Sequence, residues 1–175
     1  RDLNLLRNVL RYSADAEHRA LAAEVIAYTA NKQAVVNDLV EATRDPAEGV
    51  RNNATRALAV MAGSARQTTK QQIRIPIRPF IEMLNSIEWT DRNKSSLALL
   101  RLTHKRAPAI LSELRQKASP SLVEMARWRN SGHAYASFFL LGRVAGLPED
   151  EITAAWERGD RESFIEAAVK RAKAK

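Results

Sequence analysis

The chain has 175 residues, of which 45% are hydrophobic and 6% aromatic, and it carries a formal net charge of +8. This length corresponds to one domain with enough apolar residues for a continuous core. The chain has no cysteine, which excludes disulfides, a thiol nucleophile and a cysteine-ligated metal. No stretch approaches the roughly 20 apolar residues that span a bilayer. We therefore expect a soluble protein, either cytoplasmic or exported.

The chain begins with the leucine-rich segment RDLNLLRNVLRY, residues 1–12. Its leucines have the spacing of the second helix of a helical repeat, although no first helix precedes it. Because the sequence starts at Arg1 and not at a methionine, we expect a fragment of a longer chain. The upstream part would hold either a cleaved segment or further repeats.

The stretch DPAEGVRNNATRALAVMAG, residues 45–63, predicts a helix with a defined start. Asp45 suits the N-cap, Pro46 suits the first helical position, and Glu48 completes a capping-box pattern. Apolar residues then recur at helical spacing at Val50, Ala54, Ala57, Leu58 and Met61. Most of these side chains are small, which favours close packing of neighbouring helices on both sides, as in a solenoid.

The same pattern recurs elsewhere in the chain. Arg51 aligns with three other anchor positions, Arg19, Asn93 and His133. Each anchor is followed by a small residue three positions on and by an apolar pair six and seven positions on. Two of the three spacings fit helical-hairpin repeats of about 40 residues, and the spacing from Arg19 to Arg51 is shorter.

The sequence DPAEGVRNNATRAL closely resembles the first-helix signature of HEAT repeats, in which an Asp, a Val-Arg pair and spaced Ala and Ala-Leu positions recur. The resemblance implies an all-α fold, a right-handed α-α superhelix that forms a HEAT-like solenoid of about four helical hairpins. It also implies that Asp45 and Arg51 belong to a ladder of polar contacts between neighbouring repeats. The match is strongest in this repeat, because Asn93 and His133 have lost the arginine.

We predict a single repeat domain over residues 1–175. It would start with a partial repeat, continue with four hairpins and end with a terminal helix. The partial repeat covers residues 1–12, the hairpins cover residues 13–44, 45–88, 89–130 and 131–158, and the terminal helix covers residues 159–175. In the third hairpin, Ser119 followed by Pro120 predicts a break in the returning helix.

The positive charge is concentrated in the middle third of the chain. Residues 66–118 carry eleven basic and four acidic side chains, whereas residues 1–65 are balanced. Residues 73–78 alternate isoleucine with Arg74, Pro76 and Arg78, so an extended segment would place both arginines on one side. The candidate partner-binding residues are Arg66, Lys70, Arg74, Arg78, Lys94, Arg101 and Lys105. They would form one positive surface if the loop folded back over the third hairpin; the alternative is a solvated loop and helix face.

No pattern in the sequence predicts a catalytic, cofactor or metal site. His18, His104 and His133 are scattered, and their spacing does not put two imidazoles on one helical face. The phosphate-binding loop, the dinucleotide glycine fingerprint and the Gly-x-Ser-x-Gly elbow are absent. We therefore expect neither catalysis nor a bound cofactor.

The three tryptophans allow two interpretations. HEAT-like DNA glycosylases use tryptophans, arginines and an aspartate on a basic groove, and Trp89 precedes Asp91 by two positions. Trp89, Trp128 and Trp156 each also lie near a helix end, where a ring seals the gap between hairpins. We predict a non-catalytic scaffold that binds another protein. The alternatives are nucleic-acid or other polyanion binding through residues 66–118, and a HEAT-like lyase or DNA-glycosylase-type enzyme.

Overall fold

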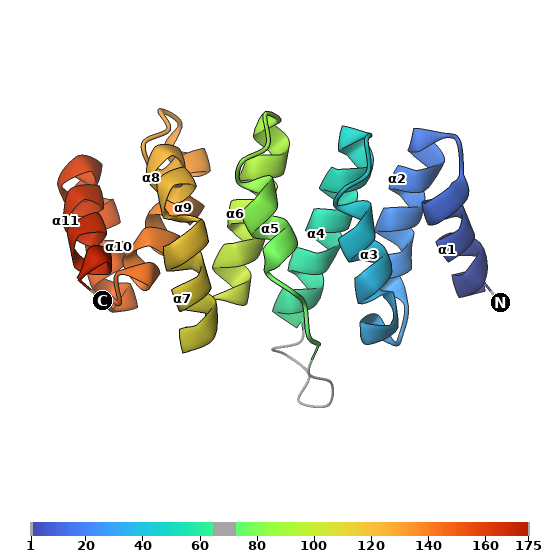
Figure 1. Cartoon of the computed structure of the whole chain (residues 1–175), viewed down its shortest axis with the longest axis horizontal. Coiled ribbons are helices and arrows are strands. Elements are labelled where there is room, and N and C mark those ends of the chain that lie inside the picture. Colours follow the sequence, from blue (N-terminus) through green and yellow to red (C-terminus); the bar gives the residue numbers. More distant parts are fainter. Residues whose placement is uncertain (1, 65–72, 175) are drawn as a thin grey trace. The chain divides into compact units, whose positions relative to one another are not determined.

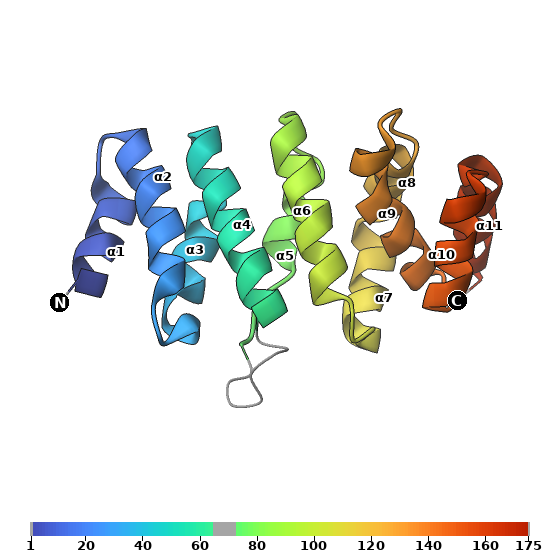
Figure 2. The same cartoon turned by 180° about the vertical axis from the view of Figure 1, so that it is seen from behind.

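The computed structural model describes residues 2–64 and 73–174, and all the regular elements in these ranges are helices (Figures 1 and 2). The predicted all-α fold is therefore confirmed. The chain divides into two compact units, residues 1–101 and 102–175. Within the described ranges no helix combines the length and the apolar character needed to cross a membrane.

The first unit is built from helices in two layers. It contains α1 (Asp2–Tyr12), α2 (Ala16–Val25), η1 (Ile26–Tyr28), η2 (Lys32–Val35), α3 (Val36–Ala42), α4 (Glu48–Ser64), α5 (Arg78–Met83) and α6 (Trp89–Leu102). Figure 2 shows α2, α4 and α6 next to one another, and Figure 1 shows α3 and α5 in the opposite layer. α4 packs on both α2 and α3. Each layer therefore holds one helix of each successive hairpin.

The predicted apolar stripe of α4 is confirmed as a packing surface. Val50, Ala54 and Leu58 are fully buried, and Ala57 and Met61 are nearly so. Thr55, on the same helix, donates its hydroxyl to the sulfur of Met83 in α5 at 3.6 Å. Small residues on a doubly packed helix thus allow close contact with neighbours in both layers.

The predicted capping box at the start of α4 is wrong. α4 begins at Glu48, and the Asp45 carboxylate accepts from the backbone N–H of Ala47 at 2.8 Å. The N–H of Asp45 already donates to the carbonyl of Ala42 at 3.2 Å. Because that donor is taken, the Glu48 carboxylate does not reach back to it and instead accepts from the hydroxyl of Thr90 in α6.

The second unit is arranged around one buried helix. It contains α7 (Pro108–Lys117), α8 (Ser119–Ala126), α9 (Ser131–Val144), α10 (Glu149–Arg158) and α11 (Arg161–Lys173). α9 packs on each of the other four helices, and ten of its fourteen residues are buried. The break between α7 and α8 comes where the Ser119-Pro120 pair predicts it.

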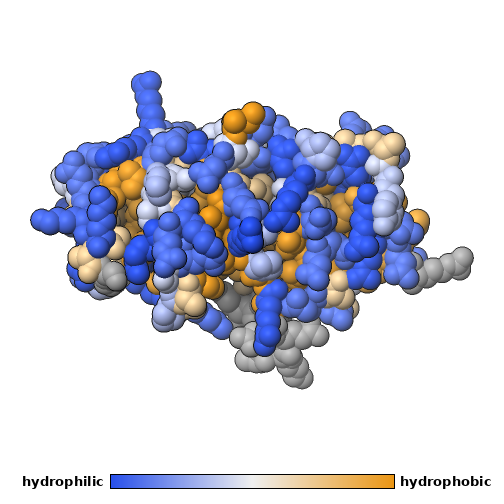
Figure 3. Space-filling model, in the orientation of Figure 1, coloured by the Kyte–Doolittle hydropathy of each residue, from blue (hydrophilic) through white to orange (hydrophobic). Residues whose placement is uncertain are grey.

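Aromatic side chains and one glycine hold α9 against α10 and α11. The rings of Phe138 and Phe164 stack with centroids 4.1 Å apart, and the Trp156 ring meets Phe138 edge-on at 5.0 Å. A Cβ atom at Gly142 would lie 2.5 Å from Cγ1 of Ile152. Glycine is required at this point because the α10 side chain occupies the space of a methyl group. Hydrophobic residues reach the surface between hydrophilic ones in the region of α8 and α11 (Figure 3).

Candidate functional site

Arginine–aspartate pairs connect successive hairpins of the first unit. Arg19 in α2 binds the Asp45 carboxylate with Nε at 2.8 Å from Oδ2 and Nη2 at 2.9 Å from Oδ1. Its Nη1 donates to the carbonyl of Ser13, six residues earlier, at 2.9 Å. The Arg19 hydrogen bond lowers the pKa of Asp45, so the carboxylate is ionised near neutral pH.

Arg51 in α4 makes a similar set of contacts one repeat further on, with one hydrogen bond to its aspartate where Arg19 makes two. Its Nη1 donates to the carbonyls of Asp45 and Pro46, each at 2.9 Å, and its Nε donates to Oδ2 of Asp91 at 2.9 Å. Asp91 is only 3% exposed and also accepts from the hydroxyl of Ser86 at 2.8 Å. Asp45 and Arg51 therefore both lie at contacts between hairpins, and these contacts hold the repeats in register.

The predicted basic residues of the loop have separate surroundings. Arg66 and Lys70 lie outside the described residues. The backbone N–H of Arg74 donates to the side chain of Gln33 in η2 at 2.8 Å, so this part of the segment lies beside the first hairpin. Arg78 is exposed and pairs with Glu82 at 2.8 Å. Because Arg74 is held beside η2, it is not folded back over the third hairpin.

The remaining basic candidates lie on α6 or just after it. Lys94 is half-buried, and Arg101 and Lys105 are exposed. Lys94 and Arg101 are seven residues apart on α6 and therefore lie on nearly the same stripe of the helix. Among the described residues, neither of these two cations forms an ion pair.

A groove lies between α2 and α4, and the residues on its two sides occupy equivalent positions of neighbouring repeats. One wall carries Glu24 and Tyr28, which belong to the stripe Leu21, Glu24, Val25 and Tyr28, and the other wall is the stripe of Asn53, Arg56, Ala57 and Val60. Each residue of the second stripe follows its counterpart by the same 32 residues that separate Arg19 from Arg51. Both stripes have the helical spacing that puts four residues on one face. The repeat itself therefore produces the groove.

Large apolar side chains are exposed along this groove. Tyr28 is 80% exposed and Val60 53%; Leu21, 59% exposed, and Val25 lie on the same stripe as Tyr28 but outside the lining of the groove. Tyr28 and Val60 line the groove directly, together with the buried side chains of Ala57 and Met61. Contiguous exposed apolar residues rimmed by polar ones are typical of an interaction surface.

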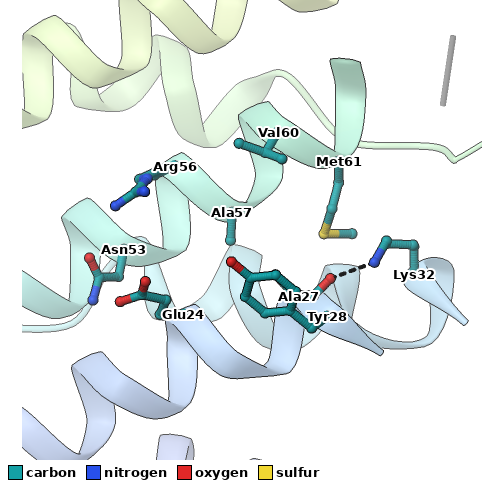
Figure 4. Close-up of a pocket in the computed structure, with 9 residues that line it drawn as sticks. All are labelled: Glu24, Ala27, Tyr28, Lys32, Asn53, Arg56, Ala57, Val60 and Met61. Atoms are coloured by element: carbon teal, nitrogen blue, oxygen red, sulfur yellow. Dashed lines mark hydrogen bonds between the residues drawn. The ribbon is translucent and has the colours of Figure 1, made fainter. Parts of the chain in front are cut away.

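The two ends of the groove are polar. Figure 4 shows Glu24, Asn53 and Arg56 together at one end, with Val60, Met61 and Lys32 toward the other. The Asn53 amide donates to the carbonyl of Ala20 at 2.9 Å, which fixes α4 against α2. Lys32 donates to the carbonyl of Ala27 at 2.7 Å. In the part of the chain that the structure describes, Glu24 and Arg56 have no ion-pair partner.

The size of the groove limits what it can hold. Its cavity is about 200 Å³. Pockets for cofactors and other small-molecule ligands usually enclose about 300 to 1,000 Å³. A cavity of this size fits one or two side chains of a partner. Arg56 and Glu24 then lie where they can contact the backbone or the charged groups of that partner.

The sequence analysis missed the groove, although a signal for it exists. Val25 and Ile26 form an apolar pair in the repeat alignment, but Val25 is exposed and Ile26 is fully buried. Both residues look like core residues in the sequence. The alignment of Arg19 with Arg51 can be extended to the residues that follow each anchor. It then pairs Tyr28 with Val60, 32 residues later, as equivalent positions of adjacent repeats.

The described part of the chain holds no histidine cluster of the kind that binds a metal ion, and Trp89 and Trp156 have different surroundings. Over residues 2–64 and 73–174, no group of three or more His, Asp or Glu residues is placed to hold a metal ion. Trp89 is the first residue of α6 and is 46% exposed, whereas Trp156 packs against the α9 aromatic residues. Trp156 thus packs inside the predicted hairpin 131–158, whereas its position near a helix end predicts a ring between hairpins.

The fold and the inter-hairpin contacts define a helical-repeat protein. Residues 3–75 match the family model of HEAT repeats, which supports a HEAT-repeat helical protein. The match covers α1 to α4 and therefore includes both walls of the groove.

Solved structures show the same fold beyond that range. Two crystal structures of engineered proteins, both Northeast Structural Genomics Consortium targets, are each 18% identical to the chain. One has a TM-score of 0.63 and covers 98% of this chain and 78% of its own; the other has a TM-score of 0.64 and covers 98% and 79%. No curated protein matches the chain in sequence. The predicted α-α solenoid is confirmed, and these likenesses concern the fold alone.

Proposed function

We propose that the chain is a non-catalytic HEAT-repeat scaffold that binds another protein through the groove between α2 and α4. The observation that carries this proposal is that the exposed apolar side chains Tyr28 and Val60 line the groove from two adjacent repeats, with the exposed Leu21 and Val25 on the same stripe as Tyr28. Repeat stacks use surfaces that run across several repeats to bind extended partners. The groove is such a surface on a small scale.

The composition of the groove favours a protein partner. Tyrosine and arginine are the residue types most often found at the energetic centres of protein interfaces, and Tyr28 and Arg56 both line this groove. Glu24 and Arg56 provide opposite charges on facing helices. A partner segment that inserts an apolar side chain near Val60 and presents both a cation and an anion would complement the groove.

Site-specific photo-crosslinking tests this proposal. A photoreactive amino acid is placed at Val60, and in a control protein at Glu41, which is exposed on α3 in the other layer. We expect a discrete adduct with a host protein from position 60, absent from position 41 and lost when Tyr28→Asp is introduced. Equal adducts from both positions, or adducts that persist in the Tyr28→Asp protein, would contradict the proposal.

One observation favours polyanion binding as a second candidate function. Lys94 and Arg101 share a stripe of α6 and have no ion-pair partner among the described residues, whereas Arg78 is paired with Glu82. If both cations contact phosphates, replacing them with alanine lowers the slope of log affinity against log salt by about 2. Arg78→Ala is the control and should leave the slope nearly unchanged. Failure of the wild-type protein to bind DNA or RNA at low salt would exclude this candidate.

A further inference from the structure

The second unit contains a wider groove than the first. It lies between α7 and α8 on one side and α11 on the other, and its cavity is about 950 Å³. Its apolar lining comes from Pro120 and Val123 of α8, Leu141 of α9, and Ile165 and Val169 of α11. Hydrophobic residues are visible at the surface over these helices (Figure 3). The volume suffices for several side chains of a partner.

The charges around this groove are mostly positive. Arg115, Arg127, Lys170 and Lys173 line it, and the acidic residue of its lining is Glu166. Arg127 is neutralised by Glu162, which accepts from its Nε at 3.1 Å. Within the described residues, Lys170 and Lys173 form no ion pair. The α11 side of the groove therefore presents two cations that an anionic partner can reach.

The spacing of the α11 residues places charge beside the apolar lining. Glu166, Val169, Lys170 and Lys173 follow one another at helical intervals and share one face of the helix. Arg171 lies between the two lysines in sequence and does not line the groove. α11 thus carries Lys170 and Lys173 beside the apolar lining of the groove. Arg171 is a cation of the same helix that lies outside the groove.

We propose that this groove binds an acidic amphipathic helix of a partner protein. An amphipathic helix places its apolar face in a hydrophobic groove through side chains at i, i+3, i+4 and i+7. Carboxylates flanking that face would meet Lys170 and Lys173. The lining contains no aromatic ring among the described residues, and single-stranded nucleic acids bind mainly by stacking on such rings, so the groove favours a protein. The proposal uses only the second unit and stands apart from the α2–α4 groove.

Fluorescence anisotropy with three labelled synthetic peptides tests the proposal. The first peptide is helical, with leucines at i, i+3, i+4 and i+7 flanked by glutamates. The second has these leucines replaced by serine, and the third has the glutamates replaced by lysine. We expect the full-length chain to bind the first peptide at least about tenfold more tightly than either of the others. Equal binding of the first two peptides would overturn the proposal, because it would show that charge alone is recognised.

Matched variants of α11 locate the binding. The Lys170→Glu, Lys173→Glu double variant should weaken binding of the first peptide by about tenfold or more, because it reverses both accessible cations of the groove. Arg171→Glu changes one charge of the same helix outside the groove and should weaken it by less than about threefold. Val169→Asp should abolish binding with the helix content unchanged by circular dichroism. Equal losses in the double variant and in Arg171→Glu, or no binding by the wild-type chain at low salt, would overturn the proposal.

Discussion

Arg19 and Asp45 are 26 residues apart and form a two-pronged ion pair between consecutive hairpins, with N–O distances of 2.8 and 2.9 Å. The same guanidinium also binds the carbonyl of Ser13, at 2.9 Å. One side chain thus joins the segment before α2 to the segment before α4. Arg51 binds Asp91 one repeat further on through a single bond from Nε at 2.9 Å, so the arginine–aspartate pairing recurs between successive hairpins.

Removing the charge of Asp45 should destabilise the first unit. Asp45→Asn keeps an oxygen that can accept from the N–H of Ala47 but leaves Arg19 without its counterion. The side chains of Arg19 and Asp45 are only 13% and 11% exposed. Leaving Arg19 uncompensated at this shielded contact should lower the midpoint of urea denaturation by more than the loss of an exposed ion pair does.

Glu82, which forms exposed ion pairs with Arg44 and Arg78, provides the control for this prediction. The side chains of Arg44 and Glu82 are 49% and 44% exposed, so solvent screens their attraction. Glu82→Gln should therefore cost at most about 1 kcal/mol. If Asp45→Asn and Glu82→Gln had equal effects, the Arg19 contact would not be what holds the hairpins in register.

Glu149 should make the stability of the second unit depend on acid pH. Hydrogen bonds from Arg143, at 2.5 Å, and from Arg106, at 2.7 Å, lower the pKa of Glu149 from 4.5 to about 2, against the opposing effect of burial. The folded state therefore binds this proton more weakly than the unfolded chain does. The stabilisation is fully present above pH 4.5 and is lost as the pH falls toward 2.

Glu149→Gln tests this pH dependence. The variant should be less stable than the wild type at neutral pH, and the difference should shrink between pH 4.5 and 2, where the unfolded wild-type chain takes up a proton at Glu149 that the folded protein does not bind. Denaturation midpoints recorded across this range would show the convergence. The exposed Glu157, changed to Gln, serves as a control. A constant difference between Glu149→Gln and wild type at all pH values would contradict the assignment.

Gly142 and Gly63 should respond to alanine in opposite directions. A Cβ at position 142 would lie 2.5 Å from Ile152, so Gly142→Ala forces α9 and α10 apart at a cost of about 1 to 3 kcal/mol. A Cβ at position 63 meets no atom within 4 Å. Gly63→Ala in α4 should therefore stabilise by about 0.5 to 1 kcal/mol through reduced backbone entropy of the unfolded chain. Thermal melts of both variants would reveal the difference in sign.

The α4 core should tolerate neither smaller nor larger side chains. Leu58 and Ala54 are both fully buried. Leu58→Ala should cost about 2 to 5 kcal/mol, and Ala54→Leu should cost about 1 to 3 kcal/mol through overpacking. Val60→Ala, at a 53% exposed position of the same helix, should change stability by less than about 0.5 kcal/mol. Unchanged denaturation midpoints for Leu58→Ala and Ala54→Leu would show that this face of α4 is not packed.

Local sequence signals predict the helices well, because caps and apolar periodicity act within one helix. The stripe from Val50 to Met61 and the break at Ser119-Pro120 both follow from such signals. Contacts between repeats are harder to predict. Asp45 precedes its helix, whereas Asp91 lies inside the first turn of α6, so the second aspartate occupies a different position relative to its helix start. The sequence alone therefore does not show that the Arg19–Asp45 and Arg51–Asp91 pairs are equivalent.

The functional surface depends on packing that the sequence pattern does not encode. Tyr28 and Val60 belong to apolar patterns that also describe core positions, and their exposure is decided by where the neighbouring helices end. The concentration of positive charge in residues 66–118 instead predicts Arg74 and Arg78 as partner-binding residues. Arg74 is held beside η2 by Gln33, and Arg78 is paired with Glu82, so these two arginines have separate surroundings, whereas Arg66 and Lys70 lie outside the described residues.

The most direct test of the proposed function compares two exposed tyrosines. Tyr28 lies in the α2–α4 groove and is 80% exposed, and Tyr12 ends α1 and is 76% exposed. Isothermal titration calorimetry measures the affinity of the host protein captured from position 60 for three forms of the chain: the wild type, Tyr28→Ala and Tyr12→Ala. A groove centred on Tyr28 predicts a loss of about 2 kcal/mol or more for Tyr28→Ala and almost none for Tyr12→Ala. Equal affinities of all three proteins would contradict it.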